Sequence, residues 1–179
     1  EGIDPDFRPD VLLRDGDQIS GSSWTLTALH TPGHLSNHLC FAWEGRDAIF
    51  SGDHVMGWAT TLISPPDGDL TAFMASLRRL QDRPEDFYYP GHGAGIFDAH
   101  GMLDYQLGHR LGREDQILAE LGKGPRDILA ITSVIYADID KRLHGAASRN
   151  VLAHIVDLYE RGLVAPQGVF SANTTFGLV

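Results

Sequence analysis

Residues 30–54 of the chain read HTPGHLSNHLCFAWEGRDAIFSGDH, and this stretch indicates a sheet with polar turns at one edge. Two apolar runs, at 38–43 and 47–51, flank the Glu-Gly-Arg sequence of residues 44–46, which is typical of a hairpin. A polar turn that contains glycine lies at each outer end of this hairpin, at 31–34 and at 52–54. Because glycine lets the backbone turn sharply, such turns can bring side chains close to a ligand.

The segments around this stretch predict a mixed α+β protein. Residues 1–10 have the composition of an irregular segment, whereas residues 11–50 have the features of β-structure, with an alternating strand at 24–29. Asp69 is a candidate N-cap for a helix that runs to about Gln81. A short β-run at 87–89 ends at the turn 90–93, and a long helical pattern follows at 98–121.

The last part of the chain predicts a second, mainly helical unit. Helices are expected at 126–136, at about 138–143 and at 146–161, followed by strands at 163–165 and 169–178. Three helices and a β-wing in this order are typical of a winged helix. We expect one domain in residues 1–100, and the long helix with a winged-helix-like domain in residues 101–179. The boundary is expected at the glycine-rich break 122–125 or within the long helix before it.

Composition limits the kinds of protein that this chain can be. With 179 residues, 42% of them hydrophobic, it can form a globular domain with a small appendage. No apolar run reaches ~18 residues, so we expect no membrane partner and a cytoplasmic location. The single cysteine, Cys40, excludes an internal disulfide and a multi-cysteine zinc site. The net charge of −10 opposes broad, nonspecific binding to nucleic acid.

Three turns that follow β-runs each present a side chain that can bind a metal ion. These side chains are His34, Asp53 and His92. A single histidine after a strand is more often a satisfied polar residue than a ligand. Two imidazoles and a carboxylate in this order and spacing, however, suit zinc or another borderline divalent ion.

The three turns together resemble the later motifs of the metallo-β-lactamase-fold hydrolases, a superfamily that includes glyoxalase II and the lactamase-β-like nucleases. The motifs that carry this resemblance are His30-Thr31-Pro32-Gly33-His34, Phe50-Ser51-Gly52-Asp53 and Tyr89-Pro90-Gly91-His92-Gly93. The tail is similar to that of the lactamase-β-like endoribonuclease group, on Gly108-His109-Arg110, Arg113-Glu114 and Gln116-Ile117-Leu118. The resemblance implies the C-terminal part of an αββα sandwich, followed by a winged-helix-like domain.

The resemblance also implies roles for the three side chains. His34 would bind the first of two zinc ions, Asp53 would bridge both ions, and His92 would bind the second. The His-x-His-x-Asp-His motif that the superfamily carries further upstream has no counterpart here, because residues 1–29 contain no histidine. We therefore expect the C-terminal portion of a longer hydrolase, which binds metal poorly and is inactive alone. Its expected partner is the N-terminal half of the same fold, with a homodimer through the exposed half-sandwich as the alternative.

The implied reaction is hydrolysis by a metal-bridging hydroxide. The similarity of the tail favours single-stranded RNA as the substrate, whereas a thioester or a lactone stays open. His54, directly after Asp53, is a candidate catalytic residue or a structural one. A non-catalytic winged-helix module that binds nucleic acid or protein is the alternative of another class. Five cations of the tail are candidate phosphate contacts or a solvated face: Arg110, Arg113, Lys141, Arg142 and Arg149.

Overall fold

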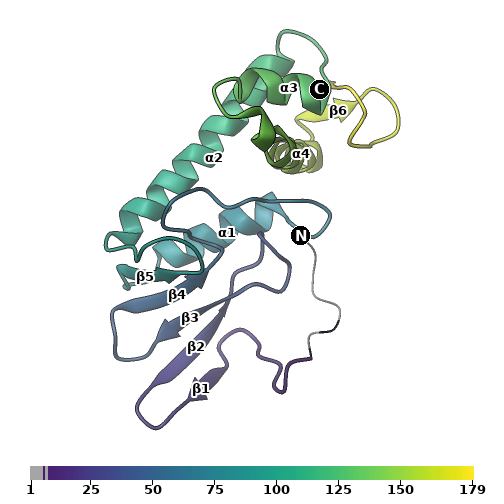
Figure 1. Ribbon diagram of the computed structural model, residues 1–179. Helices are drawn as coiled ribbons and strands as arrows, with labels where there is room; N and C mark the ends of the chain where they lie inside the picture. Colours follow the sequence, from purple (N-terminus) through teal and green to yellow (C-terminus); the bar gives the residue numbers. More distant parts are fainter. Residues whose placement is uncertain (1–5, 7) are drawn as a thin grey trace.

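The first half of the molecule is a five-stranded sheet whose strands follow one another in chain order (Figure 1). The computed structural model describes residue 6 and residues 8–179, so part of the segment predicted as irregular, residues 1–5 and 7, lies outside the described residues. The strands are β1 (Gln18–Ser20), β2 (Thr25–His30), β3 (Leu39–Trp43), β4 (Ala48–Gly52) and β5 (Phe87–Pro90). Strands β1 to β4 are antiparallel, and β5 lies parallel to β4 because helix α1 (Leu70–Gln81) connects them.

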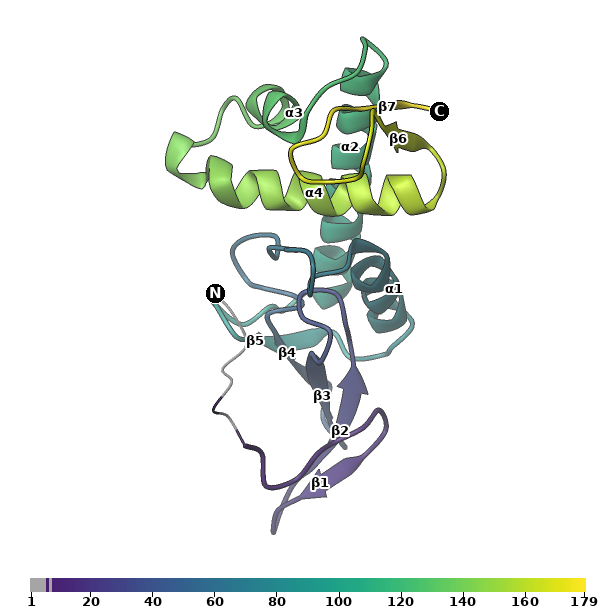
Figure 2. The ribbon, with the colours of Figure 1, turned by 90° about the vertical axis from the view of Figure 1, so that its right-hand side faces the viewer.

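Helices α1 and α2 (Ala99–Leu121) cover one face of this sheet (Figure 2). Helix α1 begins where the carboxylate of Asp69 accepts a hydrogen bond from the Ala72 amide at 2.9 Å, which confirms the predicted N-cap. Its apolar residues recur at helical spacing and enter a core shared with strands β2 to β5. Phe73 and Leu77 of α1 and Tyr88 of β5 are completely buried in this core.

The second half is built around the far end of α2, which extends from the sheet to the helical part of the molecule (Figure 2). This part contains α3 (Ile128–Ile135), the short 3₁₀ helix η1 (Lys141–Leu143), α4 (His144–Glu160) and the hairpin β6 (Val164–Pro166) with β7 (Phe176–Leu178). Leu103 of α2 lies in the core of the sheet, and Ile117 of the same helix lies in the core of the helical part. Over the described residues, no helix combines the length and apolar character needed to cross a membrane.

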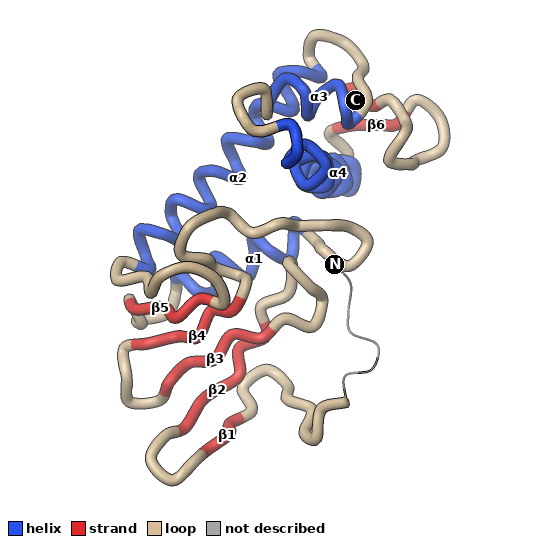
Figure 3. The backbone as a smooth tube through the Cα atoms, viewed as in Figure 1, coloured by secondary structure: helices blue, strands red, loops and turns tan. Residues whose placement is uncertain are grey.

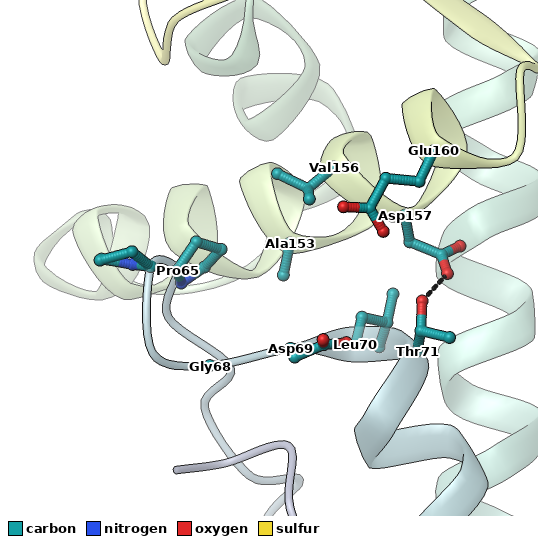
Figure 4. Close-up of a pocket in the computed structure, with 10 residues that line it drawn as sticks. Pro65, Gly68, Asp69, Leu70, Thr71, Ala153, Val156, Asp157 and Glu160 are labelled. Atoms are coloured by element: carbon teal, nitrogen blue, oxygen red, sulfur yellow. Dashed lines mark hydrogen bonds between the residues drawn. The ribbon is translucent and has the colours of Figure 1, made fainter. Parts of the chain in front are cut away.

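Helix α4 packs against the first half of the molecule as well. The hydroxyl of Thr71 on α1 donates a hydrogen bond of 2.5 Å to the carboxylate of Asp157 on α4, drawn as a dashed line in Figure 4. A cavity of about 300 Å³ lies beside this bond, between residues 65–71 and α4 (Figure 4). Ala153 of α4 enters the core of the sheet.

The other face of the sheet is not covered by a helix of the described residues (Figure 3). This face carries a row of aromatic side chains. Trp43 and Phe50 stack with ring centroids 5.9 Å apart, and Phe50 stacks on Tyr89 at 5.2 Å. Phe87 continues the row, in contact with Tyr89 and Phe97. Tyr89 is 42% exposed and Phe97 is 80% exposed. An aromatic face this open is typical of a surface that binds another layer.

The α+β class and the helical tail with its wing are confirmed, and three local predictions differ. Residues 11–13 form no strand; Val11 is 66% and Leu12 82% exposed, so no core holds them in the sheet. Strand β1 lies in the segment predicted as β-structure, but no separate strand was predicted at these residues, because Ile19 is its only apolar side chain. The second wing strand is shorter than predicted, since the hydroxyls of Ser171 and Thr174 bond to each other at 2.8 Å and close a turn before it.

Candidate metal centre

The strand directions bring the three predicted side chains to one edge of the sheet. Strands β2 and β4 are both antiparallel to β3, and β5 is parallel to β4, so all three end at the same edge. His34, Asp53 and His92 each follow one of these strand ends. One oxygen of Asp53, Oδ2, lies 3.7 Å from Nε2 of His34, and the other, Oδ1, lies 3.5 Å from Nε2 of His92.

Glycine makes this close approach of the turns possible. A Cβ atom on Gly91 would lie 2.6 Å from Oδ1 of Asp53, closer than side-chain atoms can come. The amide of Gly91 donates to the carbonyl of Gly52 at 2.7 Å, which joins the turns after β4 and β5. Gly52 has φ +54°, in the left-handed region that glycine adopts without strain. The sequence therefore has glycine where a side chain would displace the carboxylate.

The spacing of the donor atoms fits divalent ions whose coordination is completed by further ligands. Two donors that share a tetrahedral zinc ion, with bonds of ~2.0–2.2 Å, lie roughly 3.3–3.6 Å apart. Each imidazole nitrogen and the carboxylate oxygen that faces it are close to this separation. A catalytic zinc site needs three protein ligands, and each of these pairs supplies two. In keeping with this, no three His, Cys, Asp or Glu side chains of the described residues form a metal-binding group by themselves.

A backbone carbonyl fixes the orientation of His34. The Nδ1–H group of this imidazole donates to the carbonyl of Leu62 at 2.7 Å, so the lone pair lies on Nε2, which faces Asp53. Metal-binding histidines commonly use their second nitrogen in this way. His92 differs, because its side chain is 64% exposed, whereas that of His34 is 22% exposed.

Two further imidazoles, those of His38 and His54, lie beneath the rim, which is the edge of the sheet that carries His34, Asp53 and His92. The amide of Asp53 donates to Nε2 of His38 at 3.3 Å, and Nδ1 of His38 bonds to the hydroxyl of Thr31 at 2.9 Å. Burial, aided by the charge of His34, lowers the pKa of His38 to about 4, so the ring is neutral at neutral pH and can accept that amide. His38 therefore holds the backbone of Asp53 in place.

His54 points into the core rather than to the rim. Its side chain is 0% exposed and packs on Phe73, with ring centroids 4.4 Å apart. Burial, reinforced by His38, lowers its pKa well below the ordinary value. Neither ring nitrogen has a hydrogen-bond partner among the residues that the structure describes. A catalytic role for His54 stays a prediction.

A cavity of about 820 Å³ opens beside His34, between the turn after β2 and helix α4. Its lining is mostly apolar and includes Leu35, Leu62 and Leu152, together with the cation Arg149. Of the other tail cations proposed for phosphate contact, Arg110 is buried, and Arg142 pairs with Asp140 at 2.6 Å. Arg149 is thus the tail cation that lines this cavity.

Sequence reasoning did not predict which residues outside the motifs support the edge of the sheet that carries His34, Asp53 and His92. These are Thr61, whose hydroxyl donates to the carbonyl of Asp53 at 2.5 Å, Leu62, and the side chains of Arg110 and Asn150 that hold this segment. Their contacts join residues up to 87 positions apart in the chain, so no local pattern could have indicated them.

Comparisons with known proteins concern the family and the fold of the chain. The model of the metallo-beta-lactamase superfamily matches residues 1–92, and that of the beta-lactamase associated winged helix domain matches residues 128–169. A beta-lactamase-like protein 2 homolog of Drosophila melanogaster is 33% identical over 164 residues, which are 88% of this chain and 54% of that protein. An atrochrysone carboxyl ACP thioesterase of Paecilomyces divaricatus is 33% identical over 133 residues, 74% of this chain and 41% of that protein.

Two solved structures share the fold over nearly the whole chain. A metallo-beta-lactamase family protein from Thermus thermophilus is 24% identical, with a TM-score of 0.83 over 96% of this chain and 55% of its own. A beta-lactamase domain protein from Burkholderia ambifaria is 19% identical, with a TM-score of 0.85 over 99% of this chain and 54% of its own. The chain spans about half the length of these relatives, or less.

Proposed function

Because the chain belongs to the metallo-beta-lactamase superfamily, we propose that it forms part of a metal-dependent hydrolase whose ions His34, Asp53 and His92 help to hold. The observation that carries the proposal is the position of one carboxylate between two imidazoles, with donor separations of 3.5 and 3.7 Å. We propose zinc, and two ions, because the two oxygens of Asp53 face different histidines.

The chain's own residues would give these ions fixed positions. Asp53 would help to hold both ions, and the Leu62 carbonyl keeps Nε2 of His34 free to bind. When bound, divalent ions lower the pKa of water to about 7 and polarise the substrate bond that is hydrolysed. The exposed side of His92 leaves this edge of the sheet accessible from solvent.

The remaining ligands would come from outside this chain. Each ion would have two donors from this chain, and the chain spans about half the length of its relatives. We propose that the N-terminal half of the same fold supplies them and covers the aromatic face formed by Trp43, Phe50, Phe87 and Tyr89. A second copy of this chain on that face is the alternative, and sedimentation of the full-length protein as a monomer would exclude it.

An acyl thioester is the substrate that the cavity beside His34 fits best. Its lining is mainly leucine and proline, which suits an acyl chain, and Arg149 is the one cation in it. Relatives named as atrochrysone carboxyl ACP thioesterases support the same class of substrate.

Single-stranded RNA is the second candidate, favoured by the match of residues 128–169 to a winged helix domain. A polynucleotide needs several cations along its path. Here Arg142 and Arg161 are paired with carboxylates, and the whole chain carries −10. These pairings are the reason to rank RNA below the thioester.

Hydrolysis assays on the full-length protein, loaded with zinc, test both candidates. We expect an acyl-pantetheine thioester to be cleaved, His34→Ala to abolish cleavage, and His30→Ala to leave it unchanged. His30 is the matched control because it lies in the same motif and its Nε2 bonds to the carbonyl of Ser36 at 3.0 Å. Cleavage of RNA alone would overturn the choice of substrate. No cleavage of either by zinc-loaded protein would favour the non-catalytic binding module.

A further inference from the structure

Three consecutive residues, Thr61, Leu62 and Ile63, form a segment that touches two of the candidate ligands. The hydroxyl of Thr61 donates to the carbonyl of Asp53 at 2.5 Å and lies 3.2 Å from that of His54. The carbonyl of Leu62 accepts the Nδ1–H group of His34 at 2.7 Å. The 61–63 segment thus restrains the backbone of Asp53 and the ring of His34 at the same time.

The opposite side of the 61–63 segment is held by the two helices that lead into the helical part. Arg110 of α2 donates from Nη2 to the carbonyl of Thr61. Asn150 of α4 accepts the amide of Ile63 on Oδ1 at 2.9 Å, and the same oxygen accepts Nη1 of Arg110 at 3.3 Å. One guanidinium and one amide therefore connect both helices to the segment that touches the ligands.

Arg110 is an unusual residue at this position. It is 2% exposed, and the two acceptors that its Nη atoms reach are uncharged. Its guanidinium carbon lies 5.2 Å from the centre of the Phe73 ring. A buried cation without a carboxylate partner is costly, and an apolar side chain of similar length would fill the space at lower cost. The hydrogen-bond donors of Arg110, rather than the size of its side chain, therefore explain why an arginine occupies this buried position.

We propose that Arg110 and Asn150 are positioning residues, through which helices α2 and α4 set the geometry of the metal centre. Arg110 holds the peptide of Thr61, and Asn150 holds the peptide of Ile63. The Leu62 carbonyl between them is then fixed where it selects the tautomer of His34. The inference rests on the proposed metal centre, to which it adds two residues of the helical part.

The test compares matched variants of the full-length protein. Asn150→Leu and Arg110→Met keep side-chain size but remove the acceptor or the donors. Asn150→Asp retains Oδ1 as an acceptor and is expected to behave as the wild type. Val151→Ala is the control for general loss of stability, because Val151 is 1% exposed, lies next to Asn150 and belongs to the core of the helical part.

Two readouts besides activity decide the result. The first is the ¹⁵N and ¹H NMR signal of the His34 imidazole in metal-free protein, which reports whether Nδ1 carries the proton. The second is the zinc dissociation constant, measured by competition with a chromophoric chelator. We expect Asn150→Leu and Arg110→Met to shift the His34 signal and to raise the constant by about 10–100-fold. Val151→Ala should lower the melting temperature while leaving both readouts within about twofold of the wild type.

The proposal would be overturned if Asn150→Leu and Arg110→Met proteins folded and kept the His34 signal and the zinc dissociation constant of the wild type. If either variant failed to fold, Arg110→Lys, which keeps the charge and loses the fork of donors, would decide in the same way. A wild-type protein that binds no zinc would contradict the proposed function instead. The NMR signal of His34 in the metal-free protein would still decide the positioning role in that case.

Discussion

Replacing Gly91 with alanine should weaken metal binding by displacing a single oxygen atom. The added Cβ would lie 2.6 Å from Oδ1 of Asp53, whereas ordinary contact begins at 3.4 Å, so the carboxylate must retreat by about 0.8 Å. That oxygen is the one that faces Nε2 of His92 at 3.5 Å. Gly91 does not have a positive φ, so alanine can adopt its backbone conformation. The effect comes from this contact, together with tight contacts of 3.2 and 3.3 Å between the added Cβ and the carbonyl carbon and oxygen of Gly52.

The expected result is a zinc dissociation constant at least ~10-fold higher than in the wild type, about 1.4 kcal/mol of binding free energy. The assay is chelator competition on full-length protein, with circular dichroism as the check of folding. Gly108→Ala is the matched control, because its Cβ would meet no atom within 4 Å, and it lies in helix α2. This control should raise the free energy of unfolding by ~0.5–1 kcal/mol and leave zinc binding unchanged. An unchanged zinc dissociation constant in folded Gly91→Ala would show that the position of Oδ1 of Asp53 does not affect zinc binding.

Three further predictions concern stability. Burial, and then the positive charge of Arg110, lower the pKa of His154 to about 3. Below pH ~6.5 the unfolded chain therefore binds a proton that the folded protein does not. The contribution of neutral His154 to the free energy of unfolding is complete above that pH and is lost as the pH falls. Denaturation by urea should show that the wild type loses ~2 kcal/mol more than His154→Leu between pH 7 and pH 5, and equal losses would contradict this. Thr71→Val removes the bond to Asp157 and should cost about 1–2 kcal/mol of unfolding free energy at constant m-value; no loss would mean that the bond between α1 and α4 contributes nothing. Tyr89→Lys should lower the free energy of unfolding little in residues 1–179 alone, where the side chain is 42% exposed, but by ~2 kcal/mol or more in the full-length protein. Similar losses in both proteins would argue that nothing covers the aromatic face.

The strands and turns that carry the candidate ligands were predictable because each element has a local signal. Asp69 begins α1 by capping an amide three residues ahead, an arrangement that a sequence displays directly. Strands β3 and β4 were predicted from two apolar runs on either side of a glycine turn. The convergence of His34, Asp53 and His92 followed from the order of their motifs, and the parallel pairing of β4 with β5 provides its physical cause.

The supports of the site could not be predicted, because they depend on contacts between distant segments. Asn150 meets Ile63 across 87 positions, and Arg110 meets Thr61 across 49. In the sequence, Arg110 is one of the five tail cations that were grouped as candidate phosphate contacts. Its burial against Phe73 shows a different use, which only the packing of α2 on the first core reveals.

The most direct test of the account is the anomalous diffraction of zinc in crystals of the full-length protein. We expect peaks within bonding distance of Nε2 of His34, of both oxygens of Asp53 and of Nε2 of His92. Strong zinc peaks elsewhere, with these three side chains free of metal, would contradict it.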